Sequence, residues 1–195
     1  MKCKILLGIV LIHFFSPRIS MGEEKFVVEP KFSSIRCSVK YVVVPRINAD
    51  IKDFSGIIAF DPKKVDKSSV VLKIKTASID TKKPSWNRFI RSRRLLDASK
   101  YPEIVFQSQS VKYKKGQYFV KGILNMHGVS REIIFPFTIE GPVSNKNGQR
   151  LIRAKGEWLI NRKDFNVIWH KTWDKGGMII GDIVKIDWDL VGFKK

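Results

Sequence analysis

The residues best suited to bind a charged group are four arginines crowded into one segment beside two aromatic residues: Arg88, Arg91, Arg93 and Arg94, with Trp86 and Phe89. A guanidinium donates two parallel hydrogen bonds that match a pair of phosphate oxygens. The segment is therefore a candidate site for the phosphate or other polar head of a lipid, or for docking on an anionic membrane. The alternative is a helix face whose charges are simply solvated.

Metal binding and nucleophilic catalysis find little support in the sequence. After residue 22 the histidines are His127, expected in a solvent-facing turn, and His170, expected to line the mouth of a pocket or to cover one end of the fold. Neither has a histidine or cysteine partner at ligand spacing. There is no G-x-S-x-G motif, cysteine–histidine pattern or phosphate-cradling loop. Turn aspartates such as Asp61 and Asp164 fit local bonding to backbone. We predict no catalytic residue, no metal site and no cofactor.

The N-terminus has the pattern of a signal peptide over residues 1–22. A basic start precedes an apolar run over 5–15, and Ser20 and Gly22 are small residues suited to a cleavage site. The apolar run is short for a membrane span. An uncleaved anchor helix is the alternative. We expect residues 23–195 to form one mature domain that is periplasmic or secreted.

The cysteine content and net charge of that domain limit which disulfides and which partners are expected. Cys37 is its single cysteine, so no internal disulfide framework is expected, and its apolar setting favours a small buried side chain over a reactive thiol. The formal charge is +19 for the whole chain, and loss of three basic residues with the signal would leave +16. This excess favours phospholipid head groups, pyrophosphates, nucleic acids or acidic glycans. A solvated basic surface is the alternative.

Alternating apolar and polar residues predict about eight strands, bounded by turns that suit hairpins. The runs are 34–44, 54–60, 70–76, 102–111, 117–125, 131–140, 151–160 and 182–191. A loop is expected over 45–53 and a helix within the C-terminal part of 81–95, after Pro84. Gly128 is expected to adopt a backbone conformation closed to other residues. Antiparallel strands joined by short turns indicate an all-β barrel or sandwich.

An eight-stranded barrel can hold one small ligand, and the residues expected to face inward form the predicted ligand-binding set. They are Ile35, Val39, Ile58, Leu72, Ile74, Phe106, Phe135, Phe137, Trp158, Ile186 and Trp188. On pattern alone, a filled hydrophobic core remains equally open.

The order and spacing of several motifs resemble the YceI-like family over roughly residues 26 to 191. The central motifs D-x-x-x-Y-P-x-I-x-F-x-S and G-x-Y-x-V-x-G-x-L-x-x-x-G-V-[ST]-[RK] match Asp97, Tyr101, Pro102, Ile104, Phe106, Ser108, Gly116, Tyr118, Val120, Gly122, Leu124, Gly128, Val129, Ser130 and Arg131. Residues 77–81 and 160–165 match its A-S-I-D-T and I-N-R-x-D-F. The resemblance implies an extended, lipocalin-like antiparallel barrel with short helical segments, whose apolar interior holds an isoprenoid or similar lipid tail.

The chain departs from the family pattern at three places. Val39-Lys40-Tyr41 stands where a histidine is usual near the end of the first strand, Asn87 and Phe89 replace an aspartate and a histidine, and Asn166 replaces a glycine.

We therefore predict an exported lipid-binding protein, not an enzyme, that carries or stores a long-chain isoprenoid or similar lipid. An anionic membrane surface is a second expected partner, and nucleic acid is not expected. The alternative is a basic binding module for an anionic polymer or membrane surface. Lysines and arginines scattered over most strands weaken that reading, because such binding favours a clustered stripe. An enzyme would need a polar constellation inside the barrel, and the sequence suggests none.

Overall fold

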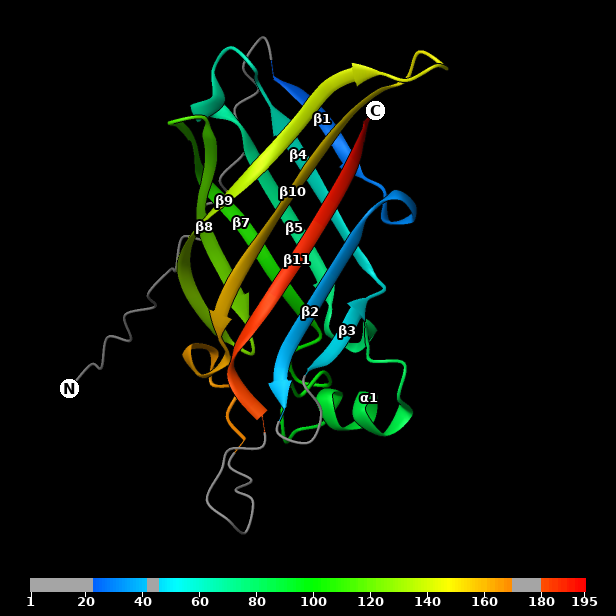
Figure 1. The fold of residues 1–195 in the computed structure, drawn as a ribbon, viewed down its shortest axis with the longest axis vertical. Coiled ribbons are helices and arrows are strands. Elements are labelled where there is room, and N and C mark those ends of the chain that lie inside the picture. The colour runs from blue at the N-terminus through cyan, green and yellow to red at the C-terminus, as the bar shows by residue number, and fades with distance from the viewer. Residues whose placement is uncertain (1–22, 42–45, 170–179) are drawn as a thin grey trace, which may run out of the picture.

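The computed structural model describes residues 23–41, 46–169 and 180–195. The chain forms an elongated barrel whose strands run obliquely along its length (Figure 1). Eight antiparallel strands close the ring, in the spatial order β1 (Glu24–Val28), β4 (Phe54–Phe60), β5 (Ser69–Lys75), β7 (Glu103–Lys114), β8 (Gln117–Met126), β9 (Val129–Ser144), β10 (Arg150–Asn161) and β11 (Ile180–Lys194). The predicted all-β antiparallel barrel is confirmed.

The barrel closes along one edge of β11, and two strands pair with different parts of this edge. β1 pairs with β4 on one side and with the C-terminal end of β11 on the other, which closes the ring. After the short 3₁₀ turn η1 (Pro30–Phe32), β2 (Ser34–Tyr41) pairs with the N-terminal part of β11. β3 (Ile47–Ile51) and β6 (Ile79–Asp80) extend the sheet beyond β2.

One helix, α1 (Pro84–Arg91), lies beside β3 at the lower end of the barrel in Figure 1. Pro84 occupies its first turn, where the missing N–H costs nothing because no helical acceptor exists there. Shorter 3₁₀ turns are η2 (Val65–Lys67), η3 (Thr76–Ser78) and η4 (Arg162–Phe165). Across the described residues, no helix combines the length and apolar character needed to cross a membrane.

The predicted strands agree with the structure to within a few residues where they are described, but one segment was assigned wrongly and one strand was missed. β3 lies inside the segment predicted as a loop over 45–53, and β1 was not predicted at all. Both are five residues long, and their pairing with neighbouring strands stabilises them more than their own pattern does. His127 is half-buried rather than solvent-facing, because its Nδ1 lies 3.2 Å from the Phe165 carbonyl and its ring packs on Tyr101.

Candidate functional site

The interior of the barrel holds an apolar cavity of about 160 Å³. Side chains from β2–β5 and β7–β11 line it, mostly at alternate positions, because successive residues of a strand point to opposite faces. On β9 the lining runs from Ile133 to Ile139, a span of about 20 Å along the strand. The cavity is therefore elongated along the barrel, a shape that suits a chain more than a compact ring.

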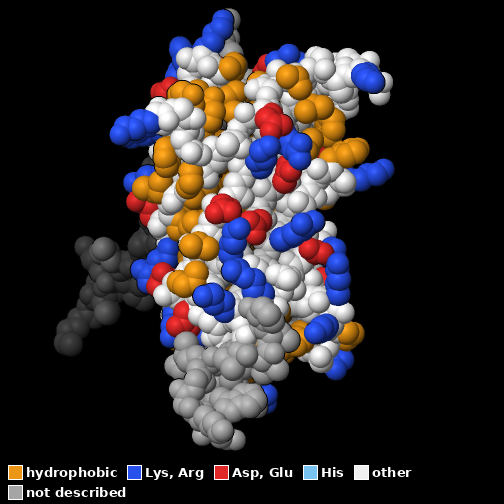
Figure 2. Space-filling view, in the orientation of Figure 1, with side chains coloured by type: hydrophobic (Ala, Val, Ile, Leu, Met, Phe, Trp, Pro, Cys, Tyr) orange, Lys and Arg blue, Asp and Glu red, His pale blue; other side chains and the backbone are white. Residues whose placement is uncertain are grey.

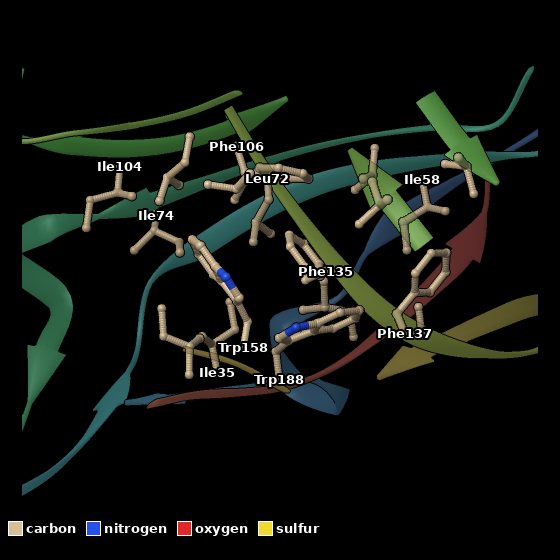
Figure 3. Close-up of a pocket in the computed structure, with 18 of the residues that line it drawn as sticks. Ile35, Ile58, Leu72, Ile74, Ile104, Phe106, Phe135, Phe137, Trp158 and Trp188 are labelled. Carbon is tan, nitrogen blue, oxygen red and sulfur yellow. The ribbon is translucent and has the colours of Figure 1, made fainter. Parts of the chain in front are cut away.

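Aromatic rings form one wall of this cavity, and Phe135 lies at their centre (Figure 3). Its ring stacks on Trp158 at a centroid distance of 5.5 Å and meets Phe106 at 5.4 Å and Trp188 edge-on at 6.0 Å. A Cβ on Gly156 would lie 2.8 Å from the Trp188 ring, so only glycine lets the indole lie against β10. The wall offers large apolar faces with little conformational freedom to lose on binding.

Polar side chains contribute little to the lining. Among the described residues they are Cys37, Ser68 and Ser69. The Ser68 hydroxyl already accepts a hydrogen bond from the Asp61 backbone N–H at 3.1 Å. The Cys37 thiol contacts the Ala49 carbonyl oxygen at 3.7 Å, and burial, with a smaller contribution from the Asp50 charge, raises the pKa of this thiol to about 11. The cavity is suited to holding an apolar group, because its lining among the described residues includes no charged side chain.

The structure brings ten of the eleven predicted interior residues together around this one cavity. That they bind a ligand stays a prediction. Val39 is the exception. It follows Cys37 on the same face of β2 and pairs with Val184 and Ile47, beyond the last residue of that strand that reaches the cavity.

The predicted ligand-binding set left out other lining residues, and for most of them the signal was available. Ile104 precedes Phe106 by two positions, Ile133 and Ile139 flank Phe135 and Phe137, and Val120 and Leu124 share one face of β8. Period-two counting along each strand would have included them. Ile51 had no such signal, because it lies in the segment predicted as a loop.

The four arginines lie outside the cavity, on α1 and the turn that follows it. Arg88, Arg93 and Arg94 are exposed, whereas Arg91 is half-buried and its Nη2 donates to the Ile79 carbonyl at 2.8 Å. Arg91 thus ties α1 to β6. The predicted role of the group as a head-group or membrane site stays a prediction. His170, predicted at the mouth or the covered end of the barrel, lies outside the described residues.

Charges of both signs are interspersed on the face formed by β9, β10 and β11 (Figure 2). Arg153 pairs with Asp189 across β10 and β11, and Lys155 pairs with Glu140 across β10 and β9. Such pairs place acidic side chains among the basic ones, so the described residues of this face form no continuous basic stripe of the kind that tracks a polyanion.

Comparison with known proteins confirms the family resemblance. Residues 26–192 match the family described as YceI-like domain. A UPF0312 protein of Vibrio cholerae is 29% identical over 167 residues, which cover 84% of this chain and 88% of that protein. Protein YceI of Salmonella newport is 26% identical over 166 residues, which cover 84% of this chain and 87% of that protein.

Solved structures share the same barrel. The crystal structure of Burkholderia cenocepacia BcnA is 27% identical, with a TM-score of 0.74 over 84% of this chain and 98% of that chain. A domain of Saccharophagus degradans, described as a polyisoprenoid binding domain implicated in plant cell wall breakdown, has a TM-score of 0.64. It is 13% identical and covers 90% of this chain and 100% of that chain, so the likeness to it is one of fold alone.

Proposed function

This chain belongs to the YceI-like family, and we propose that it is an exported protein whose barrel binds a long-chain apolar ligand, an isoprenoid or similar lipid. The observation that carries the proposal is the elongated cavity lined almost wholly by aliphatic and aromatic side chains. The description of the Saccharophagus degradans domain as polyisoprenoid-binding supports the same ligand class for a barrel of this shape. The role is one of binding for transport or storage rather than catalysis.

Burial of the tail supplies the affinity. Each Å² of apolar surface removed from water contributes about 25 cal/mol before the costs of association. A cavity of about 150 Å³ accommodates a ring the size of benzene, so the 160 Å³ present here holds only part of a long chain. A longer tail requires rings such as Phe135 and Trp158 to change rotamer. Tail length is therefore limited by how far this aromatic wall can move.

Export is the second part of the proposal and rests on the basic and apolar pattern of residues 1–22. The mature protein begins near Glu23 and acts outside the cytoplasm. N-terminal sequencing of the protein purified from its native cell checks this. Retention of Met1 on a cytosolic protein contradicts export while leaving lipid binding untouched.

Mass spectrometry of organic extracts from the purified native protein tests ligand binding directly. A Phe137→Asp variant places a charge in the apolar wall, which is costly, and is expected to copurify with no lipid. Thr138→Asp is the matched control, because it adds the same charge one residue away on the exposed face of β9. Ala154→Leu is a milder variant that fills the cavity without adding charge.

Lipid loads equal to that of the unmodified protein in folded Phe137→Asp and Ala154→Leu variants would contradict binding inside the barrel.

The salt dependence of the binding affinity distinguishes this function from polyanion binding. Affinity for a neutral long-chain lipid changes little with salt, whereas a polyanion complex weakens by orders of magnitude as counterion release becomes less favourable. A protein that binds polyanions only at low salt and no lipid at any salt would overturn the proposal.

A further inference from the structure

The wall of the barrel opens between β9 and β10. Their pairing ends at Lys155 and Thr138. Beyond that point β9 continues beside β8 as far as Val129, and β10 continues beside β11 to Asn161 (Figure 1). Pro136 lies on β9 where the separation begins, and proline has no N–H to donate to a neighbouring strand. The two strands therefore lose their shared ladder over the last part of β10.

A groove of about 480 Å³ occupies this opening. Its lining comes from β9, from β10 and from the turn η4: Arg131, Glu132, Ile133, Ile134, Trp158, Leu159, Ile160, Asn161, Asp164 and Phe165. Ile133, Trp158 and Ile160 also line the inner cavity. The groove and the cavity thus meet at shared side chains, and movement of the Trp158 indole would join them.

Two apolar side chains, Ile134 and Leu159, lie at the rim of the groove, where a barrel surface is expected to be polar. Ile134 and Leu159 face outward and are 59% and 62% exposed. If the register of the paired part continued, these two residues would stand opposite each other. Hydrophobic side chains are visible along the left side of the molecule in Figure 2, among charged ones. An apolar rim lowers the cost of moving a lipid tail past it.

The polar part of the groove carries no excess of positive charge. Nε of Arg131 donates to the Asp164 backbone carbonyl at 3.1 Å, and this hydrogen bond orients the guanidinium. The two terminal nitrogens of the guanidinium can then donate to a ligand. The carboxylates of Asp164 and Glu132 also line the groove, and Glu132 pairs with Lys121 at 2.9 Å. This balance disfavours a pyrophosphate and favours an uncharged group that accepts hydrogen bonds, such as a hydroxyl or carbonyl oxygen.

We propose that the lipid enters and leaves sideways between β9 and β10, and that its uncharged polar end rests in this groove against Arg131. The inference rests on the proposed lipid-binding function. It moves the polar end away from the arginines of α1, where the sequence led us to expect it. The tail extends from the groove past Trp158 into the cavity.

Photo-crosslinking distinguishes these two positions of the polar end. One polyprenol probe carries a diazirine next to its hydroxyl group, and a second carries it at the far end of the tail. The first is expected to label peptides containing residues 131–134 and 157–164, and the second to label cavity residues outside the groove. Labelling of residues 86–94 by the first probe overturns the inference but leaves lipid binding standing. Failure of both probes to label the barrel contradicts lipid binding itself.

Loading kinetics test the path of entry. Ile134→Lys combined with Leu159→Lys makes the rim charged, and uptake of polyprenol from phosphatidylcholine vesicles is expected to slow roughly tenfold because the tail must pass two charges. The matched control is Ile57→Lys with Val143→Lys, at positions that are 49% and 52% exposed elsewhere on the barrel. All four positions are exposed, so both variants retain the core. Equal loading rates in the two variants overturn the side entrance.

Discussion

Arg150 at the start of β10 holds the carboxylate of Glu24 at the start of β1 with two hydrogen bonds, each 2.7 Å long. The two residues are 126 positions apart in the chain. Lys194 at the end of β11 contacts the same carboxylate at 3.0 Å. One acidic residue thus joins three strands at the upper end of the barrel, where β1 closes the ring.

Replacing Glu24 by glutamine is expected to lower the free energy of unfolding by about 1 kcal/mol at pH 7, because the pair is charge-assisted but partly exposed. The hydrogen bond from Arg150 lowers the pKa of Glu24 despite the opposing effect of burial, and Lys194 lowers it further. The stabilisation is therefore present above the ordinary pKa of 4.5 and is lost as the pH falls through the lowered value. Urea unfolding from pH 7 to pH 2 checks that the difference between the two proteins disappears in acid.

Alanine substitutions at Gly128 and Gly148 distinguish the stability cost of backbone strain from the cost of a steric clash. Both have a φ of +76°, but a Cβ on Gly128 would lie 2.7 Å from the Tyr101 ring, whereas nothing lies within 4 Å of one on Gly148. Gly148→Ala is expected to cost about 1 kcal/mol, from the left-handed conformation alone. Gly128→Ala is expected to cost roughly 1–3 kcal/mol more, since the ring must move. Equal losses in thermal unfolding would show that Tyr101 adjusts freely.

Phe135 is expected to stabilise the barrel even though it borders a cavity. Truncation to alanine removes contacts with Phe106, Trp158 and Trp188 and should lower the free energy of unfolding by about 3 kcal/mol. Phe135→Leu keeps most of the volume and should cost about 1 kcal/mol. If the aromatic wall limits the tail, the alanine variant should also copurify with longer or bulkier lipids. An unchanged lipid profile would show that another part of the cavity sets the limit.

The alkylation rate of Cys37 should show whether its thiol is protonated in the folded protein. Because its pKa is raised from 9.0 to about 11, the thiolate is about a hundredfold scarcer at pH 8 than in an ordinary cysteine. Iodoacetamide should therefore react slowly with the folded protein that begins at Glu23, and at an ordinary rate after unfolding in urea. Mass spectrometry of the alkylated protein measures both rates. Rapid alkylation of the folded protein would contradict a thiol that stays protonated in the wall of the cavity.

The exposed arginines of the α1 segment can be tested without disturbing Arg91, which bonds to β6. Replacing Arg88, Arg93 and Arg94 by glutamine should weaken binding to phosphatidylserine vesicles by roughly a hundredfold, at about 1 kcal/mol per charge. Replacing Lys112, Lys114 and Lys115 removes the same charge from the hairpin between β7 and β8 and serves as the control. Equal losses in vesicle sedimentation would mean that net charge, rather than this segment, drives docking.

The sequence by itself determined the strand periodicity and the hairpins, because alternation and turn chemistry are local properties of the chain. Phe135 and Phe137 share a face because they are two residues apart in a strand, and Gly128, with its φ of +76°, lies in the turn that its sequence predicted. The same local reasoning placed ten of the eleven expected residues on one interior surface. The order and spacing of the motifs were sufficient to identify the family.

Tertiary structure alone decided the features that depend on partners distant in the chain. β1 and β3 are too short to form without the hydrogen bonds of their neighbours, so their own residues gave no clear signal. A cavity instead of a filled core results from how rings such as Trp158 and Trp188 pack from facing strands. The opening between β9 and β10 depends on where the pairing between these two strands ends. Strand pattern predicts which face a residue occupies, but only packing determines how much space that face encloses.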